Sequence, residues 1–553
     1  MRGFFLLDKI VNKLQKRIKK WQKEPNHILN LSKLELKEIP PEILNLKGLT
    51  RLNLSINKIC DLEPLTTLNN LVYLDVGHNK IKNIDALKKL TQLKYLDIGL
   101  NEISNLHPLK KLIQLTHLNL GDNPIKSVKA LKNLKKLKKV FLNERKNKIE
   151  DLHKLKHLTA LEQLYFGGSY VENIDAFRHF GCLKNLTHLH LQNNKIKDIK
   201  PLQHLTSLKY LNLSMNKIEN IEPLKNLTKL KDLSLRRNEI YSLNGIQQLT
   251  KLQQLNLATN DIQDITPLAS LNNLKRLNLA DNLIKNIEPL KDLKKLLYVG
   301  LQHNRIQDIT HLKSLKQLNS LGLENNPIIN FEPLKFLSSL ISLNLSGTQL
   351  STLAPISCLC QLKYLYLENN HIQNIKILKS FNHLVELQLS NNQISNIQPL
   401  QYLKKLKELR ACSNNIENLH AIKNLTALTD LRLDYNQIKN IQPLRNLKNL
   451  DNLNLTNNNI KNIQIISGLK KLTGLDLSHN IIESLPPLPK LEYLNVSNNN
   501  ISEIVKLSVL TSLEYVFIAD NPVWQKYNIT HLEDDGFYSH TPFIKEFLKE
   551  HKI

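Results

Sequence analysis

Residues 208–249 decide the fold, because two closely similar segments follow one another there. The first reads LKYLNLSMNKIENIEPLKNLTK over 208–229, and the second reads LKDLSLRRNEIYSLNGIQQL over 230–249. The leucines, isoleucines and asparagine of the first segment recur 22 residues later in the second. Self-similarity at such a period is typical of a solenoid, in which each repeat packs only against its neighbours.

The template L-x-x-L-x-L-x-x-N-x-I-x-x-I-x-x-L-x-x-L extends outward from this stretch through most of the 553-residue chain. Its asparagine slot predicts about 23 repeats, three of which have Leu34, Ser169 or Thr348 in the slot. The other repeats have Asn57, Asn79, Asn101, Asn123, Asn147, Asn194, Asn216, Asn238, Asn260, Asn282, Asn304, Asn326, Asn370, Asn392, Asn414, Asn436, Asn458, Asn480, Asn499 and Asn521.

Each part of the template predicts a local structure. The L-x-L alternation predicts a short strand with both leucines buried and their neighbours on the opposite face. The asparagine side chain can satisfy backbone groups where the chain turns away, which predicts a structural ladder of asparagines. In ten repeats a proline seven residues after the asparagine predicts the first residue of a short helical turn, as at Pro64 and Pro223. We therefore predict an α/β solenoid, a horseshoe or arc with a parallel sheet on its concave face and 3-10 or extended turns on its convex face.

On this template the chain resembles a leucine-rich repeat protein of the 22-residue class. That class includes internalin-like proteins and the regulatory subunit of type-1 protein phosphatase. The resemblance covers roughly residues 28–523. It implies the solenoid fold and a role in protein binding, whereas a phosphatase-regulator role is implied by the resemblance alone.

Three segments are expected: an N-terminal capping helix over 1–27, the solenoid over 28–523 and a C-terminal cap over 524–553. Apolar residues at helical spacing from Phe4 to Trp21, with lysines on the other faces, indicate a basic amphipathic helix. This helix either caps the core or binds a membrane surface or an acidic partner. The longer repeats between Asn123 and Asn194 are either binding features or harmless drift.

The net charge of +27 makes nucleic acid or anionic membrane a possible partner. Residues six, four and two positions before each slot asparagine are expected to line the concave face. Those three columns contain more acidic than basic residues, so the basic excess belongs to the outer turns and the N-terminal helix. Lysines spread over a convex surface are typical of solubility rather than of a binding site.

Nine of the 15 tyrosines fall in the concave columns, which favours protein recognition, although tyrosine also suits strands in general. We predict two protein-binding clusters and one further contact at Tyr210. The N-terminal concave cluster comprises Tyr73, Asp75, Tyr95, Asp97 and His117. The C-terminal concave cluster comprises Tyr364, Tyr366, Glu368, Glu386, Glu408, Arg410, Asp430, Arg432 and Asp434. The second mixes aromatic, acidic and arginine side chains, which suits a basic or mixed-charge protein surface.

No catalytic motif is present, so we expect no enzyme activity, cofactor or metal. The sequence contains no Walker loop, G-x-S-x-G or H-E-x-x-H. His117, His188 and His190 are expected on the concave side without a carboxylate to orient them. Five scattered cysteines and the absence of a signal peptide, membrane span or anchor motif favour a cytoplasmic location, with non-classical secretion left open.

The sequence thus predicts a non-catalytic scaffold that binds a partner protein on its concave face. One alternative is a peripheral anchor that binds anionic membrane or nucleic acid through the N-terminal helix and the convex lysines. Another is a secreted, internalin-like adhesin or effector.

Overall fold

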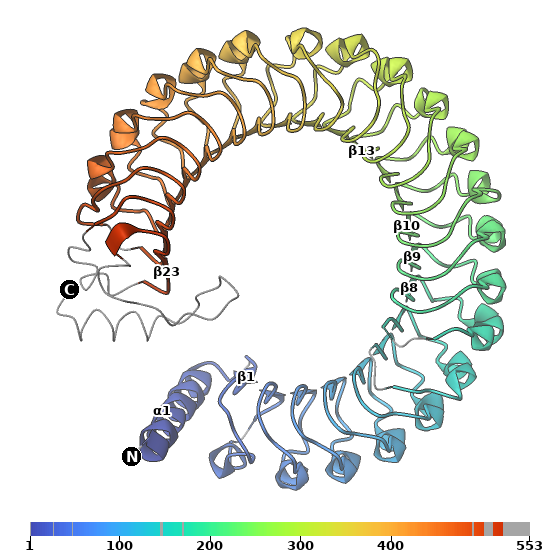
Figure 1. Ribbon diagram of the computed structural model, residues 1–553. Coiled ribbons are helices and arrows are strands. Elements are labelled where there is room, and N and C mark those ends of the chain that lie inside the picture. Colours follow the sequence, from blue (N-terminus) through green and yellow to red (C-terminus); the bar gives the residue numbers. More distant parts are fainter. Residues whose placement is uncertain are drawn as a thin grey trace. The chain divides into compact units, whose positions relative to one another are not determined.

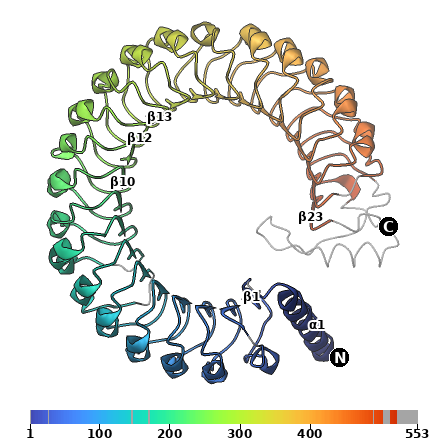
Figure 2. The same ribbon diagram turned by 180° about the vertical axis from the view of Figure 1, so that it is seen from behind.

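The computed structural model describes residues 2–25, 27–46, 48–143, 147–168, 171–488, 491–502 and 513–523, with the side chains of 2–10 left out. The predicted C-terminal cap, residues 524–553, lies outside the described residues, as does Ser169. Contacts divide the chain into two units, one ending at Asn282 and the other beginning at Leu283. In each unit the strands line the inner side and the 3-10 turns lie on the outer side (Figure 1, Figure 2).

The first unit contains one α-helix and twelve described strands. The helix is α1 (Arg2–Lys23). The strands are β1 (Leu29–Asn30), β2 (Arg51–Asn53), β3 (Tyr73–Asp75), β4 (Tyr95–Asp97), β5 (His117–Asn119), β6 (Lys139–Phe141), β7 (Gln163–Tyr165), β8 (His188–His190), β9 (Tyr210–Asn212), β10 (Asp232–Ser234), β11 (Gln254–Asn256) and β12 (Arg276–Asn278). Its 3-10 turns are η1 (Pro41–Ile43), η2 (Glu63–Thr67), η3 (Asp85–Lys89), η4 (His107–Lys111), η5 (Lys129–Asn133), η6 (Leu152–His157), η7 (Asp175–Cys182), η8 (Lys200–Leu202), η9 (Glu222–Asn226), η10 (Ile246–Gln248) and η11 (Thr266–Ser270).

The second unit repeats this architecture with eleven described strands. They are β13 (Tyr298–Gly300), β14 (Ser320–Gly322), β15 (Ser342–Asn344), β16 (Tyr364–Tyr366), β17 (Glu386–Gln388), β18 (Glu408–Arg410), β19 (Asp430–Arg432), β20 (Asn452–Asn454), β21 (Gly474–Asp476), β22 (Tyr493–Asn495) and β23 (Tyr515–Phe517). Its described 3-10 turns are η12 (Glu288–Leu290), η13 (Thr310–Ser314), η14 (Glu332–Phe336), η15 (Ala354–Ile356), η16 (Lys376–Ser380), η17 (Gln398–Tyr402), η18 (His420–Ile422), η19 (Gln442–Asn446) and η20 (Gln464–Gly468).

The predicted fold class is confirmed. Within each unit neighbouring strands pair in parallel, and the register keeps equivalent template positions opposite one another, for example Leu211 with Leu233. The leucines and isoleucines of the template are buried, and each contributes about 1.5–3 kcal/mol to the folded state. A column of aligned positions therefore runs along the sheet of each unit, and this alignment determines which concave side chains become neighbours.

The slot asparagines bond neighbouring repeats together. Asn238 donates through Nδ2 to the carbonyl of Leu235 in its own repeat (2.9 Å) and to that of Leu213 in the preceding repeat (3.0 Å). Its Oδ1 accepts a hydrogen bond from the N–H of Ile218 (3.0 Å). Most of these asparagines are buried. Their hydrogen bonds therefore satisfy backbone groups that the turn would otherwise leave unpaired in the core.

The prolines lie one position later in the outer turns than predicted. Pro64 is the second residue of η2, not the first, and the other nine occupy the same place in their turns. The first residue, Glu63, uses its N–H to bond Asp61 Oδ1 (2.9 Å). A proline has no N–H to donate, so it fits the next position instead.

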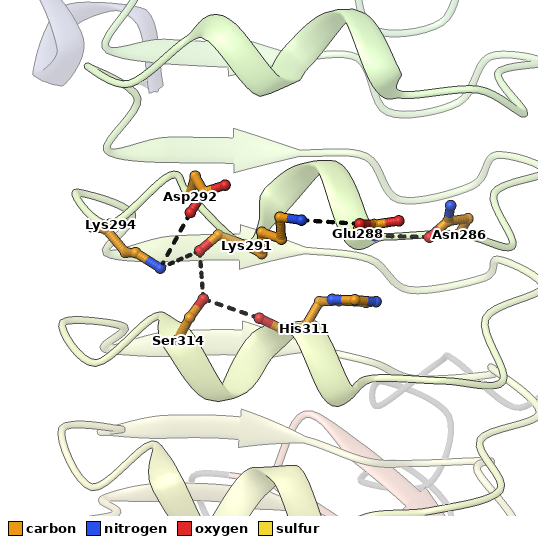
Figure 3. A network of polar contacts seen from close by, with 7 residues as sticks. All are labelled: Asn286, Glu288, Lys291, Asp292, Lys294, His311 and Ser314. Atoms are coloured by element: carbon orange, nitrogen blue, oxygen red, sulfur yellow. Dashed lines mark hydrogen bonds and ion pairs between the residues drawn. The ribbon is translucent and has the colours of Figure 1, made fainter.

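Figure 3 shows the same hydrogen bond at the start of an outer turn in the second unit, where Asn286 Oδ1 accepts from the N–H of Glu288 (2.8 Å). Lys291 pairs with the Glu288 carboxylate (3.0 Å), and Ser314 of the next turn donates to the carbonyl of Lys291. The lysine side chains drawn here therefore bond within their own turn, and a serine hydroxyl joins that turn to the next one.

The longer repeat that ends at Asn194 takes up its extra residues on the outer side. Its turn, η7, has eight residues, whereas most of the turns have five or fewer. Phe177 and Phe180 of this turn are fully buried, with ring centroids 4.8 Å apart, and fill the additional space. In the other long repeat, residues 144–146 lie outside the described residues.

Candidate functional site: the concave sheets

The N-terminal concave cluster is assembled by strand register on β3, β4 and β5. Tyr73 lies opposite Tyr95, and Tyr95 lies opposite His117. The two tyrosine rings stack with centroids 4.3 Å apart, and the Tyr95 and His117 centroids are 6.0 Å apart. Arg51 lies over the Tyr73 ring at 5.3 Å. These rings form a continuous aromatic edge along three strands.

Two carboxylates lie beside this edge. Asp75 and Asp97 are opposite one another on β3 and β4. Burial and the neighbouring Asp97 raise the pKa of Asp75 to about 6, and burial also raises the pKa of Asp97. Asp97 accepts a hydrogen bond from Asn119 Nδ2 (2.9 Å). This bond stabilises the charged carboxylate and offsets part of the rise in its pKa. The pair is therefore a site where a partner's positive charge or a proton would relieve repulsion.

The tyrosines themselves remain neutral. Burial, followed by the charge of Asp75, raises the pKa of Tyr73, and burial and Asp97 raise that of Tyr95. Burial and Lys139 lower the pKa of His117, so its imidazole is neutral at physiological pH. The aromatic edge is consequently uncharged and offers apolar area with hydrogen-bonding tips.

The structure adds aromatic residues that the sequence analysis did not assign to a site. Phe141, Tyr165 and His190 stack in succession, with centroid separations of 4.3 Å at each step. Tyr210 stacks on His188 (4.2 Å) and does not join the N-terminal concave cluster. Counting all ring-bearing residues in the concave columns, rather than tyrosines, would have found these stacks.

The C-terminal concave cluster lies on β16 to β19 and on the residues that follow them. In one column Tyr364, Glu386, Glu408 and Asp430 stand opposite one another in succession. In the next column Tyr366, Gln388, Arg410 and Arg432 are aligned in the same way. Glu368 and Asp434 follow β16 and β19 by two residues. Register thus brings the predicted members together on one surface.

Polar contacts inside this cluster are few. Tyr366 Oη donates to Glu386 Oε2 (3.2 Å), and Gln388 Nε2 donates to Glu386 Oε1 (2.7 Å). Burial and Glu386 raise the pKa of Tyr366 to about 12, and burial raises that of Glu368. Arg432 pairs with Asp430 of its own strand (3.3 Å). Among the described residues, Arg410 forms no ion pair, and its buried Nε has no hydrogen-bond partner.

Family comparison identifies the repeat. The family described as leucine-rich repeats in two copies matches residues 69–111, 113–157, 184–226, 272–314, 360–402 and 448–490, and the single leucine-rich repeat matches 490–510. The chain is a leucine-rich repeat protein. No curated protein matches it.

Solved structures of other leucine-rich repeat proteins are similar to this one. A leucine-rich repeat protein of Leptospira interrogans has 27% identity over 70% of this chain and 97% of its own, with a TM-score of 0.57. The Arabidopsis receptor kinase HAESA ectodomain, solved with a peptide hormone ligand, has 23% identity over 89% of this chain and 90% of its own (TM-score 0.50). An internalin from Listeria monocytogenes has 31% identity over 61% and 85% (TM-score 0.44).

Within the described part of this leucine-rich repeat protein, no three His, Cys, Asp or Glu side chains are placed to hold a metal ion. The described helices also include none with the length and apolarity required to cross a bilayer. Cys412, which follows β18 by two residues, is partly buried, and burial together with Asp434 raises the pKa of its thiol to about 12. The thiol is therefore protonated and a poor nucleophile.

Proposed function

We propose that this protein is a non-catalytic scaffold that binds a partner protein through the C-terminal concave cluster. The observation that supports the proposal is that Tyr364, which is 37% exposed, lies on the same sheet face as Glu408 and Arg410, two strands away. Neither of these two charged residues forms an ion pair with any described residue. Tryptophan, tyrosine and arginine are the residue types most enriched among the energetic hot spots of protein interfaces. Charges without internal partners gain more from a complementary partner than charges already paired.

The test compares capture of partners by two variants of the full chain. Y364A/Y366A/E386K/E408K changes the proposed surface. The control, Y241A/Y402A/E222K/E332K, makes the same kinds of change outside the concave columns, where Tyr241 is 63% exposed and Tyr402 is 51% exposed. We expect a protein captured from source-cell lysate by the wild type and the control but lost with the concave variant. Equal capture by both variants, each shown to be folded by circular dichroism, would overturn the proposal.

Site-specific crosslinking provides an independent readout of the same surface. Benzoylphenylalanine replaces Tyr364 on the concave face in one protein and Tyr402 of η17 on the outer face in another. We expect a crosslinked partner band only from the Tyr364 position. A band of equal intensity from the Tyr402 position would place the partner elsewhere.

A second candidate function, binding to an anionic surface, is favoured by one observation on α1. Leu14, Ile18 and Trp21 of this helix are buried. The face opposite them carries exposed lysines at 3–4 residue spacing, Lys13, Lys16, Lys20 and Lys23. Arg17 and Trp21 hold the helix against the first repeat through bonds to the carbonyls of Ser32 (2.7 Å) and His27 (3.0 Å).

The anchor function predicts sedimentation with phosphatidylserine vesicles that falls steeply as salt rises. K13E/K16E/K20E/K23E would abolish the sedimentation, whereas K291E/K294E/K313E/K316E on the outer turns of the second unit would not. If sedimentation is absent at low salt, or is equal in the two variants, α1 is not a membrane anchor and capping of the first repeat is its remaining role.

A further inference from the structure

The charges of the C-terminal concave cluster form two parallel rows on its sheet. The acidic row consists of Glu386, Glu408 and Asp430, which stand directly opposite one another on β17, β18 and β19. The arginine pair, Arg410 and Arg432, occupies the neighbouring column on β18 and β19. Successive members of each row are therefore separated by the distance between parallel strands, about 4.8 Å.

Both rows contain charges that the protein does not neutralise by itself. In the acidic row, Glu386 is bonded only by the neutral donors Tyr366 and Gln388, and Glu408 forms no ion pair among the described residues. In the arginine pair, Arg432 pairs with Asp430. Within the described part of the chain, Arg410 has neither an ion pair nor a partner for its buried Nε, and its charge acts on Glu368 only through space. A partner that fits this surface must bring cations to the acidic row and a carboxylate to Arg410.

The spacing of the rows distinguishes between the shapes that such a partner could have. Side chains on one face of an α-helix recur about every 5.4 Å, close to the strand separation of about 4.8 Å, so three of them would drift from the acidic row by about 1 Å. Alternate side chains of an extended peptide recur about every 6.7 Å and would drift by about 4 Å over the same row. Long lysine and glutamate side chains can absorb the first mismatch but not the second.

We infer that the C-terminal concave cluster binds an α-helix laid along the sheet axis, with Lys or Arg at i, i+4 and i+7 facing the acidic row and Glu or Asp on the adjacent stripe facing the arginine pair. The inference rests on the proposed function and names the chemistry of its partner. The exposed Tyr364 lies at the end of the acidic row, where it would contact apolar stems of the partner's first turn.

The test uses three labelled peptides of equal composition with the full-length protein, and fluorescence anisotropy as the readout. One is a helix-forming peptide with the two stripes, one is a helix-forming peptide with the same charges spread around all faces, and one is an extended peptide with the lysines at alternate positions. We expect the two-stripe helix to bind at least about tenfold more tightly than either of the others. Circular dichroism checks the helicity of each peptide.

Two variants of the protein make the assignment specific. E386Q/E408Q/D430N removes the acidic row and should weaken the two-stripe helix about tenfold. The control E222Q/E288Q/E332Q makes the same change in net charge on outer-turn glutamates that are 50–57% exposed, and should leave binding unchanged.

The second stripe is tested by a double-mutant cycle between Arg410→Met and a peptide whose acidic stripe is replaced by Gln. Each change alone should weaken binding. We expect the second change to cause little further loss of binding free energy once the first has been made, because both remove the same contact. Additive losses would show that the acidic stripe does not meet Arg410.

Several outcomes would overturn the inference: equal binding of the extended or scrambled peptide, unchanged binding by the acidic-row variant, or no saturable binding of the two-stripe helix below about 1 mM. These outcomes leave the proposed function standing if lysate capture still depends on Tyr364, Tyr366, Glu386 and Glu408. Loss of that dependence would instead remove the proposed function itself.

Discussion

Tyr73 and Tyr95 stack almost in parallel across β3 and β4, with their ring planes 11° apart and their centroids 4.3 Å apart. The same strand register that stacks these rings also places Asp75 directly opposite Asp97. Attraction between the rings and repulsion between the carboxylates are therefore consequences of one alignment. This coupling makes the stability of the N-terminal concave cluster dependent on pH.

Asp75→Asn should stabilise the first unit at neutral pH. The pKa of Asp75 is about 6 in the folded protein against 3.8 for the free side chain. The folded state therefore binds more protons between these values, and stability falls as pH rises through this window. Removing the charge should increase the free energy of unfolding by about 1–2 kcal/mol above pH 7 and change it little below pH 4.

Hydrogen-exchange mass spectrometry of peptides covering β2 to β5 measures this gain at both pH values. Asp85→Asn is the control, because its hydrogen bond to Lys88 lowers the pKa of that exposed carboxyl. The control should show no gain at neutral pH. A gain from Asp75→Asn that persists at low pH would contradict a charge-based cause.

Asn238→Ala should destabilise its neighbourhood by about 3 kcal/mol, because the substitution leaves the N–H of Ile218 and two carbonyls unpaired in the core. Faster amide exchange should be greatest in the repeats that contain Ile218 and Asn238, since bonds extend only to adjacent repeats. Asn226→Ala, at an exposed position of η9, is the matched control. Equal effects of the two substitutions would show that the ladder contributes little.

Ile56→Asn should stabilise the protein by about 1 kcal/mol. Ile56 is 41% exposed and has φ 55°, a left-handed conformation that a β-branched residue adopts only with strain. Asn457 has φ 52° at the equivalent position of another repeat, so Asn457→Ile should lose a similar amount. Urea unfolding followed by circular dichroism measures both changes, and shifts of the same sign would refute the explanation by strain.

Gly167→Ala should cost about 1–3 kcal/mol, whereas Gly468→Ala should stay within about 0.5 kcal/mol of the wild type. A Cβ at Gly167 would lie 2.7 Å from the carbonyl oxygen of Gln192, which is backbone and cannot move aside. A Cβ at Gly468 would meet only Lys448 Nζ at 3.1 Å, the mobile end of a side chain. Thermal unfolding of the two variants in parallel provides the comparison.

The sequence was sufficient for the repeat, the buried leucine columns and the strand register, because each depends on a pattern that recurs every 22 residues. It predicted the ten prolines at the first residue of each outer turn instead of the second, since nothing in the period shows that Asp61 bonds the N–H of Glu63. The strain at Ile56 was also hidden, because the equivalent position in other repeats contains residues as different as Asn, His, Leu, Arg and Tyr and has no residue signature.

For the candidate site, the 22-residue spacing alone predicted that Glu386, Glu408 and Asp430 lie in one column, and the strand register places them opposite one another. The sequence pattern did not predict which side chains in these columns form hydrogen bonds with one another. The bond from Tyr366 to Glu386, and the lack of a described partner for Arg410 Nε, depend on rotamers that period and composition do not determine. The stack of Phe141 on Tyr165 involves a phenylalanine, which a count of concave tyrosines alone does not include.

The hydrogen bonds of a slot asparagine extend back by one repeat and no further. If residues 217–238 were deleted, Asn216 would be followed by Glu239, and Asn260 would keep its bond from the N–H of Ile240. Its lost acceptor, the carbonyl of Leu235, would be replaced by that of Leu213, the equivalent residue one repeat earlier. Genes encoding such a chain can therefore gain or lose 66 base pairs, the coding length of one 22-residue repeat, through unequal recombination, because an equivalent residue replaces each lost hydrogen-bond partner. The length of this protein is thus free to evolve separately from the chemistry of its concave face.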